Sequence, residues 1–184
     1  MTKEDKKILL NLARQSIERV LAKKGKALLP QEDICFIKGG VFVTLSINGN
    51  LRGCIGHFTG IGSLGRTIQA MAIEAAFADP RFVPLTKKEL EFIDIEISVL
   101  SPMFRVKPED VQPGIHGLYI RYGVHAGTLL PQVASECGWN REEFLSHTCL
   151  KAGLPADTYL KKTTEIFAYT AEVFNEKTER EESK

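Results

Sequence analysis

The 184-residue sequence has few cysteines, no long apolar run and almost no net charge. Four scattered cysteines are too few for a disulfide framework, so we expect free thiols and a reducing compartment. No apolar run approaches the ~20 residues that a membrane span needs. Residues 1–7 are charged and lack the apolar core of a signal peptide. The sequence therefore predicts a cytoplasmic protein with no membrane partner.

Its charge gives no reason to expect a nucleic-acid partner. Lys and Arg total 24 and Asp and Glu total 23, which leaves a formal net charge of +1. Nucleic-acid binding needs a basic stripe with aromatic side chains that stack on bases. The pairs Lys87-Lys88 and Lys161-Lys162 are too sparse to form one, so this class ranks last.

Several motifs of common enzyme classes are also missing. The sequence has no G-x-S-x-G, P-loop, H-E-x-x-H or C-x-x-C, which removes the common hydrolase, kinase, metalloprotease and redox interpretations. Cys137, His147 and Cys149 lack the short paired spacing of zinc ligands, so no metal site is expected. Residues 60–65 match G-x-G-x-x-G, but the strand before them belongs to a hairpin, which argues against dinucleotide binding. Anion binding at the start of the next helix and a plain glycine turn both stay open.

Hydrophobic periodicity predicts an α+β fold. The expected helices cover residues 8–21, 63–78, 131–137 and 140–153, and the expected strands cover 41–47, 51–56, 92–100, 118–122, 124–130 and 165–174. This order is not a regular alternation of strand and helix, and several strands alternate polar and apolar residues as antiparallel strands do. We therefore expect a mixed, mostly antiparallel sheet flanked by helices. The domain is expected over residues 1–176, with a charged, disordered tail at 177–184.

The residues around Asn48-Gly49-Asn50 predict a β-hairpin, because Asn and Gly accept the positive φ angles of tight turns. A two-residue loop would turn Arg52 and Cys54 toward the valines of the first strand. A three-residue loop instead places Arg52 and Cys54 on the polar face, so we predict that register. It pairs Ile47 with Leu51, Leu45 with Gly53, and Val43 with Ile55.

The second strand of this hairpin carries the main candidate site. Arg52 and Cys54 lie two residues apart on one strand face, and a nearby guanidinium favours the thiolate form of a cysteine. Arg52 could equally bind a substrate carboxylate or phosphate. Gly53 and Gly56 interrupt the strand, which usually marks close approach by another backbone or a ligand. In the alternative interpretation Cys54 is a small buried residue and Arg52 forms a structural ion pair.

Two further charged residues are candidates for the same cleft. Glu96 lies on the polar face of the 92–100 strand and is a natural partner for Arg52 if the strands are close. Arg81 follows the glycine-loop helix in Asp79-Pro80-Arg81-Phe82, where it reaches the cleft or only forms a local ion pair. The candidate catalytic residues are therefore Cys54 and Glu96, and the candidate ligand-binding residues are Arg52, Gly53, Gly56 and Arg81.

Five short segments together resemble the AMMECR domain family, whose bacterial and archaeal members are called AmmeMemoRadiSam system protein A. They occur in family order from about residue 5 to 176, so the resemblance covers nearly the whole chain. The hexapeptide at 51–56 is close to diagnostic, whereas Tyr159 stands where many members carry tryptophan. The segments are Leu51-Arg52-Gly53-Cys54-Ile55-Gly56, Asp79-Pro80-Arg81-Phe82, Ile95-Glu96-Ile97-Ser98-Val99-Leu100, Leu130-Pro131-Gln132-Val133 and Lys151-Ala152-Gly153-Leu154.

The resemblance implies a two-lobed α+β fold whose hexapeptide lines a cleft, and a genomic association with Memo-type and radical SAM proteins. It specifies neither a reaction nor a cofactor. The leading hypothesis is an enzyme or its substrate-handling component: Arg52 binds an anionic small molecule, Cys54 acts as nucleophile or close-contact residue, and Glu96 orients Arg52 or moves a proton. The alternative is a non-catalytic module that binds a protein partner or a ligand.

Overall fold

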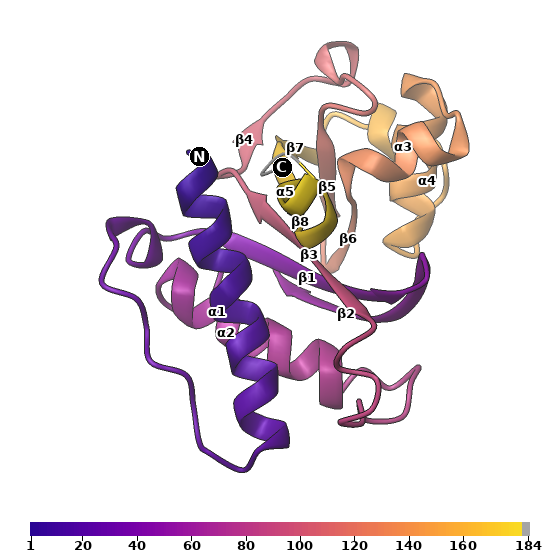
Figure 1. The fold of residues 1–184 in the computed structure, drawn as a ribbon. Coiled ribbons are helices and arrows are strands. Elements are labelled where there is room, and N and C mark those ends of the chain that lie inside the picture. The colour runs from indigo at the N-terminus through magenta and orange to yellow at the C-terminus, as the bar shows by residue number, and fades with distance from the viewer. Residues whose placement is uncertain (182–184) are drawn as a thin grey trace. The chain divides into compact units, whose positions relative to one another are not determined.

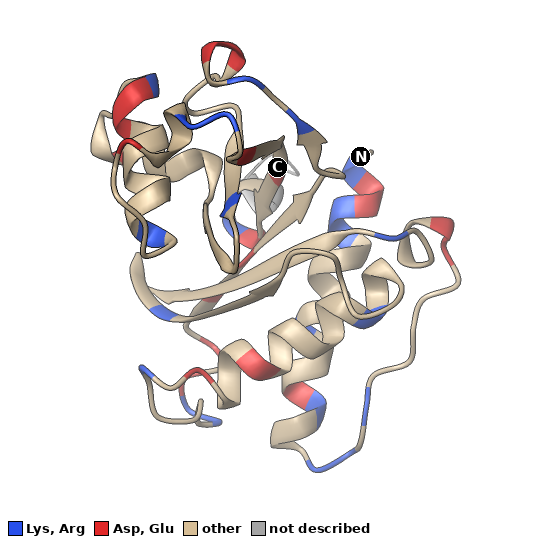
Figure 2. Cartoon of the chain, turned by 180° about the vertical axis from the view of Figure 1, so that it is seen from behind, with Lys and Arg blue, Asp and Glu red and all other residues tan. Residues whose placement is uncertain are grey.

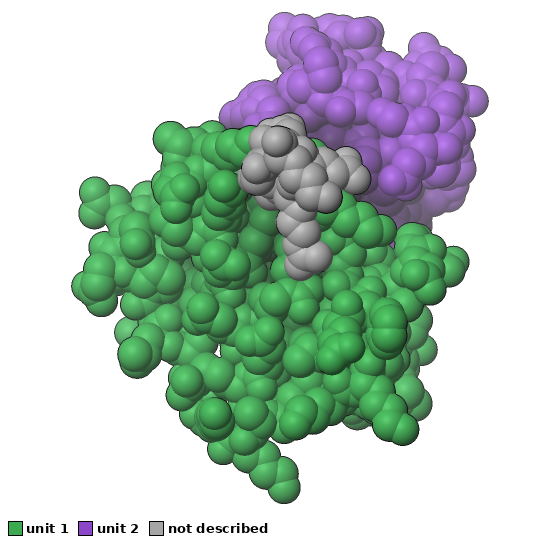
Figure 3. All heavy atoms as spheres, viewed as in Figure 1, with its two compact units in different colours: residues 1–100, 172–184 green, residues 101–171 purple. Residues whose placement is uncertain are grey.

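The computed structural model describes residues 1–181 and divides into two compact units (Figures 1 and 3). Unit 1 is formed by Met1–Leu100 together with the chain from Glu172 onward, and unit 2 by Ser101–Ala171. Each unit has its own four-stranded sheet and its own hydrophobic core. The predicted α+β class and two-lobed organisation are confirmed.

Unit 1 is a sheet with strand order β2-β1-β3-β8, so β2 and β8 are its edge strands. Two long helices pack against it, and contacts join α1 to α2, α2 to β1 and β2, and α1 to β3. In Figure 1 both helices lie on the same face of this sheet. The elements are α1 (Lys3–Leu21), β1 (Gly40–Ile47), β2 (Asn50–His57), α2 (Leu64–Phe77), β3 (Ile93–Leu100), β8 (Ala171–Asn175) and α5 (Glu176–Glu181), with a 3-10 turn η1 at Asp33–Cys35.

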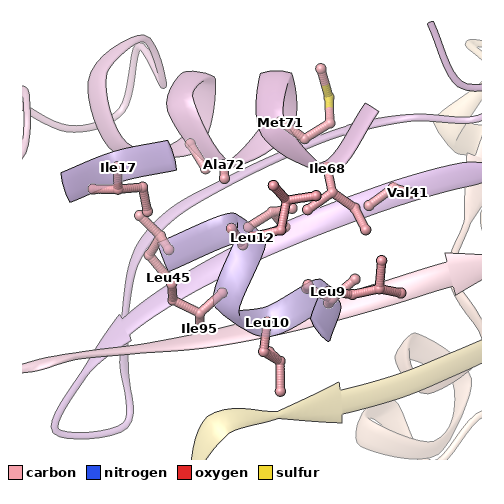
Figure 4. Packing of buried hydrophobic residues seen from close by; sticks show 14 of the residues in the cluster. Leu9, Leu10, Leu12, Ile17, Val41, Leu45, Ile68, Met71, Ala72 and Ile95 are labelled. Carbon is pink, nitrogen blue, oxygen red and sulfur yellow. The ribbon is translucent and has the colours of Figure 1, made fainter. Parts of the chain in front are cut away.

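The core of unit 1 forms where the apolar stripe of α1 meets α2 and the covered face of the sheet (Figure 4). A capping box between Thr2 and Asp5 fixes the start of α1. Full burial of one Leu or Ile side chain contributes about 1.5–3 kcal/mol, so this stripe anchors the helix. The fully buried side chains include Leu9, Leu12 and Ile17 from α1, Ile68 and Ala72 from α2, and Val41, Val43, Leu45, Ile95 and Ile97 from the sheet.

The predicted hairpin register is confirmed in the body of the strands and wrong at the turn. Val43 pairs with Ile55 and Leu45 with Gly53, but Ile47 pairs with Asn50. The turn therefore has two residues, Asn48 and Gly49, with φ angles of 52° and 80°. The register shifts between Leu45 and Ser46, which leaves Arg52 as the extra residue of a β-bulge. The two-residue turn alone would turn the side chains of β2 to the opposite faces from those predicted. The extra residue at the bulge reverses the alternation once more, so the side chains beyond it lie on the predicted faces.

Unit 2 is a sheet with strand order β4-β7-β5-β6. Its elements are β4 (Phe104–Arg105), β5 (Gly117–Tyr122), β6 (His125–Leu129), α3 (Pro131–Cys137), α4 (Arg141–Lys151) and β7 (Glu165–Tyr169), with 3-10 turns η2 at Pro108–Asp110 and η3 at Thr158–Leu160. Asn140 and Glu143 form a capping box at the start of α4. The sequence did not predict β4, which has only two residues and pairs with Phe167 and Ala168.

The predicted last strand, 165–174, is two strands that join different sheets. It breaks at Thr170, whose backbone N–H and C=O bond to Ser101. The chain then continues as α5, where Glu176 is buried and forms an ion pair with Arg14 at 2.5 Å. The predicted disordered tail begins at residue 177; the structure assigns residues through Glu181 to α5, and residues 182–184 lie outside the described part.

None of the helices within residues 1–181 combines the length and apolar character needed to cross a bilayer.

Candidate functional site

The candidate site lies in unit 1, at the edge strand β2. Both backbone hydrogen-bonding groups of Cys54 are occupied by the segment that follows α2. The N–H of Cys54 donates to Asp79 Oδ2 at 2.8 Å, and Arg81 Nη2 donates to the Cys54 carbonyl at 3.1 Å. An unprotected edge strand exposes such groups and invites pairing with another chain. The segment after α2 therefore covers the sheet edge at the cysteine.

Asp79 is the centre of this contact, and its side chain is almost fully buried. Besides the Cys54 amide, its carboxylate accepts hydrogen bonds from Arg81 Nε at 3.0 Å, Arg81 Nη2 at 2.7 Å and the Arg81 amide at 3.1 Å. The Arg81 guanidinium, together with the two backbone amides, holds the pKa of Asp79 far below its usual range. The local ion pair predicted within Asp79-Pro80-Arg81-Phe82 is confirmed, and Arg81 also reaches Cys54.

Arg52, the bulge residue, has a different partner from the one predicted. Its Nε donates to Glu89 Oε1 at 2.8 Å and its Nη2 donates to the Val83 carbonyl at 2.9 Å. Glu89 also accepts from the backbone and hydroxyl of Thr86. The hydrogen bond from Arg52, and to a smaller extent those from Thr86, lower the pKa of Glu89 to about 2. The expectation that Glu96 orients Arg52 is corrected, because Glu89 does so.

The ring of Phe82 connects these two ion pairs. Its centroid lies 5.9 Å from the Arg52 guanidinium carbon and 5.5 Å from that of Arg81, within cation–π range. Arg52, Asp79, Arg81, Phe82 and Glu89 are called the edge cluster below. It carries two positive and two negative charges, so it is neutral as a whole.

Cys54 and Glu96 lie in one row across the sheet. Cys54 pairs with Thr44 on β1, and Thr44 pairs with Glu96 on β3. The Thr44 hydroxyl donates to Cys54 Sγ at 3.3 Å. Because neighbouring strands are about 4.8 Å apart, the backbones of Cys54 and Glu96 are separated by about 10 Å. The structure thus places both predicted catalytic residues on the same face, with Thr44 between them.

The two predicted glycines have a packing role. A Cβ atom on Gly53 would lie 2.1 Å from the Ala75 carbonyl oxygen of α2, and one on Gly56 would lie 2.1 Å from the Phe42 ring. Gly53 thus allows close approach by another backbone, as glycine within a strand often does. Ligand binding by Gly53 and Gly56 stays a prediction.

All four cysteines are free thiols, and they differ in environment. Cys35 and Cys149 are buried, and burial raises the pKa of each thiol. Cys137 is exposed, and Cys54 is half-buried. Among residues 1–178, whose side chains the structure describes, no three His, Cys, Asp or Glu side chains are close enough together to hold a metal ion.

A sequence model of the AMMECR1 family matches residues 10–174, which includes every residue of the candidate site. The chain belongs to the AMMECR1 family. The resemblance read from its short motifs is therefore confirmed. A protein of Methanothermobacter thermautotrophicus is 40% identical over 185 residues, with 96% of each chain covered. A protein of Thermococcus onnurineus is 42% identical over 182 residues, covering 91% of this chain and 88% of that one.

The fold of this AMMECR1-family chain is also seen in a crystal structure. The uncharacterized protein PH0010 from Pyrococcus horikoshii superposes with a TM-score of 0.86 at 38% sequence identity, covering 96% of this chain and 93% of that one. The agreement supports the α+β architecture.

Proposed function

We propose that this protein is an enzyme, or the substrate-handling component of one, in which Cys54 contacts the substrate at the edge of β2. The proposal rests on the hydrogen bonds that hold Cys54 in place. Asp79 and Arg81 bind its backbone, and the Thr44 hydroxyl donates to its sulfur. A reacting or contact group works best when neighbouring residues hold it in place. A hydroxyl donor on the sulfur also stabilises negative charge that develops there.

Arg81 is better placed than Arg52 to bind an anionic group of the substrate. The side chain of Arg52 is only 11% exposed and binds Glu89, whereas the side chain of Arg81 is 54% exposed. Arg81 uses Nε and Nη2 for Asp79 and Cys54, and Nη1 donates to no residue within the described chain. The N–H groups of Nη1 can therefore donate a charge-assisted hydrogen bond to a carboxylate or phosphate. Arg52 then acts by positioning the strand.

Glu96 is proposed to accept or deliver a proton on the substrate. It faces the same side of the sheet as Cys54, about 10 Å away by strand spacing. A substrate that contacts both groups must therefore extend across Thr44. Amines and carboxylic acids of only a few atoms are too short to do so.

Alkylation of the four thiols tests the role of Cys54. Wild-type protein is treated with limiting iodoacetamide at neutral pH, and each cysteine is quantified by peptide mass spectrometry. We expect Cys54 to be modified faster than the more exposed Cys137, and the buried Cys35 and Cys149 to be modified slowest. Equal or slower modification of Cys54 than of Cys137 would remove the nucleophile role.

A matched pair of arginine variants separates the local effect of Arg81 from a general effect of charge. Arg81→Gln removes a guanidinium that bonds to the Cys54 carbonyl, and it should slow the alkylation of Cys54. Arg121→Gln removes an exposed, carboxylate-paired guanidinium in unit 2 and should leave that rate unchanged. Equal rates for both variants would show that Arg81 does not act on the cysteine.

A second candidate function is a non-catalytic binding module, and the neutrality of the edge cluster favours it. Both guanidinium groups of the cluster are already paired with carboxylates, as in a structural ion-pair network. Under either function we propose the Memo-type and radical SAM proteins as partners, a proposal supported by the family resemblance. Purified Cys54→Ser should retain partner capture if the protein is only a binding module.

A further inference from the structure

A groove in unit 1 lies apart from the Cys54 site, between α1, the segment 26–29, the glycine loop and α2. Its volume is about 510 Å³, within the range of about 300–1,000 Å³ typical of small-molecule sites. Cys54 contacts the segment that follows the C-terminal end of α2, whereas the groove is lined by α2 residues from Arg66 to Ile73. The groove is lined by Ser16, Lys26, Ala27, Leu29, Ile61, Arg66, Gln69, Ala70 and Ile73.

One face of α2 forms a wall of this groove. Arg66, Gln69, Ala70 and Ile73 have the spacing i, i+3, i+4, i+7 of a single helix face. This face is distinct from the buried stripe of α2, which contacts the core. It leaves Ala70 and Ile73 half-buried, so α2 carries an apolar strip that neither α1 nor the sheet fully covers.

The opposite wall is fixed to α2 by a polar and an apolar contact. Gln69 Nε2 donates to the Ala27 carbonyl at 2.8 Å. Leu29 packs against the core, and its Cδ2 atom is the nearest neighbour that a Cβ on Gly65 would meet, at 3.0 Å. The groove is thus a formed feature of unit 1.

The charged side chains of the groove are all positive. Its lining contains Lys26 and Arg66 and no aspartate or glutamate. Neither cation forms a salt bridge with any residue of the described chain, and the first turn of α2 has no acidic residue to neutralise Arg66. Basic residues also mark the segment after α1, at the bottom of Figure 2.

We infer that this groove binds a small amphipathic anion, with a carboxylate or phosphate head at Arg66 and Lys26 and an apolar body along Ile61, Ala70 and Ile73. Small-molecule sites combine mostly apolar walls with a few convergent polar groups, and this groove has that composition. A guanidinium binds either head group through paired hydrogen bonds. The inference is independent of the function proposed for Cys54.

NMR titration of the ¹⁵N-labelled full chain with four probes tests the inference: three carry an eight-carbon chain and the fourth is a head group alone. They are octanoate, octyl phosphate, octanol and inorganic phosphate. We expect at least one of the two amphipathic anions to shift the amide signals of residues 26–29, 61 and 66–73. Octanol and inorganic phosphate should each bind about tenfold more weakly, because each lacks one of the two interactions. The stronger of octanoate and octyl phosphate identifies the head group.

Three variants assign the binding to the groove. Arg66→Gln removes an exposed charge and should weaken the anionic probe by about tenfold while leaving octanol unchanged. Ala70→Phe fills the groove and should weaken all apolar probes. Lys87→Gln, an exposed cation elsewhere in unit 1, serves as control. Octanol binding as tightly as the stronger of the two anions, unchanged affinity of that anion in Arg66→Gln, shifts outside the groove, or no shift with any probe at millimolar concentration would each overturn the inference.

Discussion

Replacing Asp79 with asparagine removes the buried negative charge on which the edge cluster depends. The Asp79 carboxylate accepts hydrogen bonds from the Cys54 amide and from the Arg81 amide, Nε and Nη2. In Asp79→Asn these donors lose a charged acceptor, and the Asn side-chain N–H group can face them instead. The variant is isosteric, so no cavity contributes to the result.

The cost follows from how much of this contact is shielded from water. A hydrogen bond to a charged group contributes about 1.5–3 kcal/mol net. The Arg81 side chain is 54% exposed, so water replaces most of its lost contacts. The Cys54 amide has no such replacement while the segment stays in place. We therefore expect the free energy of unfolding to fall by about 2–3 kcal/mol at pH 7.

The pH dependence of this loss has a definite sign. The folded-state pKa of Asp79 lies below its unfolded value, mainly because of Arg81. The ionised carboxylate therefore stabilises the fold at every pH above about 4, and this contribution is lost only as pH falls through the folded-state value. The difference between wild type and Asp79→Asn should be constant from pH 7 to 5 and shrink below pH 4.

Urea denaturation at several pH values measures this difference, with Glu165→Gln as the control. Glu165 pairs with Arg121 on the surface of unit 2, so its loss should change stability much less. A loss below about 0.5 kcal/mol for Asp79→Asn, the usual effect of surface changes, would refute the structural role of the carboxylate.

Three further predictions concern residues around Cys54 and the edge cluster. Glu89→Gln should lower the free energy of unfolding by about 1 kcal/mol at pH 7, because it removes the carboxylate that pairs with Arg52. Since the folded-state pKa of Glu89 is about 2, this loss should fade as pH falls from about 4.5 toward 2, as measured by urea denaturation. Gly53→Ala should cost about 2–3 kcal/mol in thermal unfolding, because its Cβ would lie 2.1 Å from a carbonyl oxygen of α2. Thr44→Val should slow iodoacetamide modification of Cys54 without unfolding the protein, since it removes the hydroxyl donor on the sulfur; an unchanged rate would deny that donor a role.

The sequence predicted the elements whose local signals agree with their tertiary contacts. The helix at 131–137 begins at a proline and ends before Gly138, whose φ is 67°, so its predicted bounds match the structure. The Asn140 capping box and the alternating strand that ends at Leu100 were likewise predictable. In each of these elements the local signal, a capping residue or the hydrophobic periodicity, predicts the same structure as the burial of the side chains.

The hairpin shows where such reasoning fails. The alternation of polar and apolar residues correctly paired Val43 with Ile55 and Leu45 with Gly53, but that reasoning considered only the length of the loop and not a bulge. The structure keeps the two-residue turn that Asn48 and Gly49 favour and corrects the register with a bulge at Arg52. No local pattern in a single sequence distinguishes these two solutions.

The partner of Arg52 was also beyond the reach of sequence patterns. Glu89 lies 37 residues away, in an irregular segment where neither strand nor helix periodicity assigns a direction to a side chain. The division of 165–174 between two sheets was missed for a related reason. Residues before and after Thr170 are equally suited to a strand, and only the strand pairing separates them.

The most direct test of the proposed role of Cys54 is the ratio of its alkylation rate to that of Cys137, measured in the same sample for wild type and Asp79→Asn. If the edge cluster holds a reactive thiol in position, the ratio exceeds one in wild type and drops toward one in the variant. A ratio at or below one in wild type, or one that the variant leaves unchanged, would contradict the proposal.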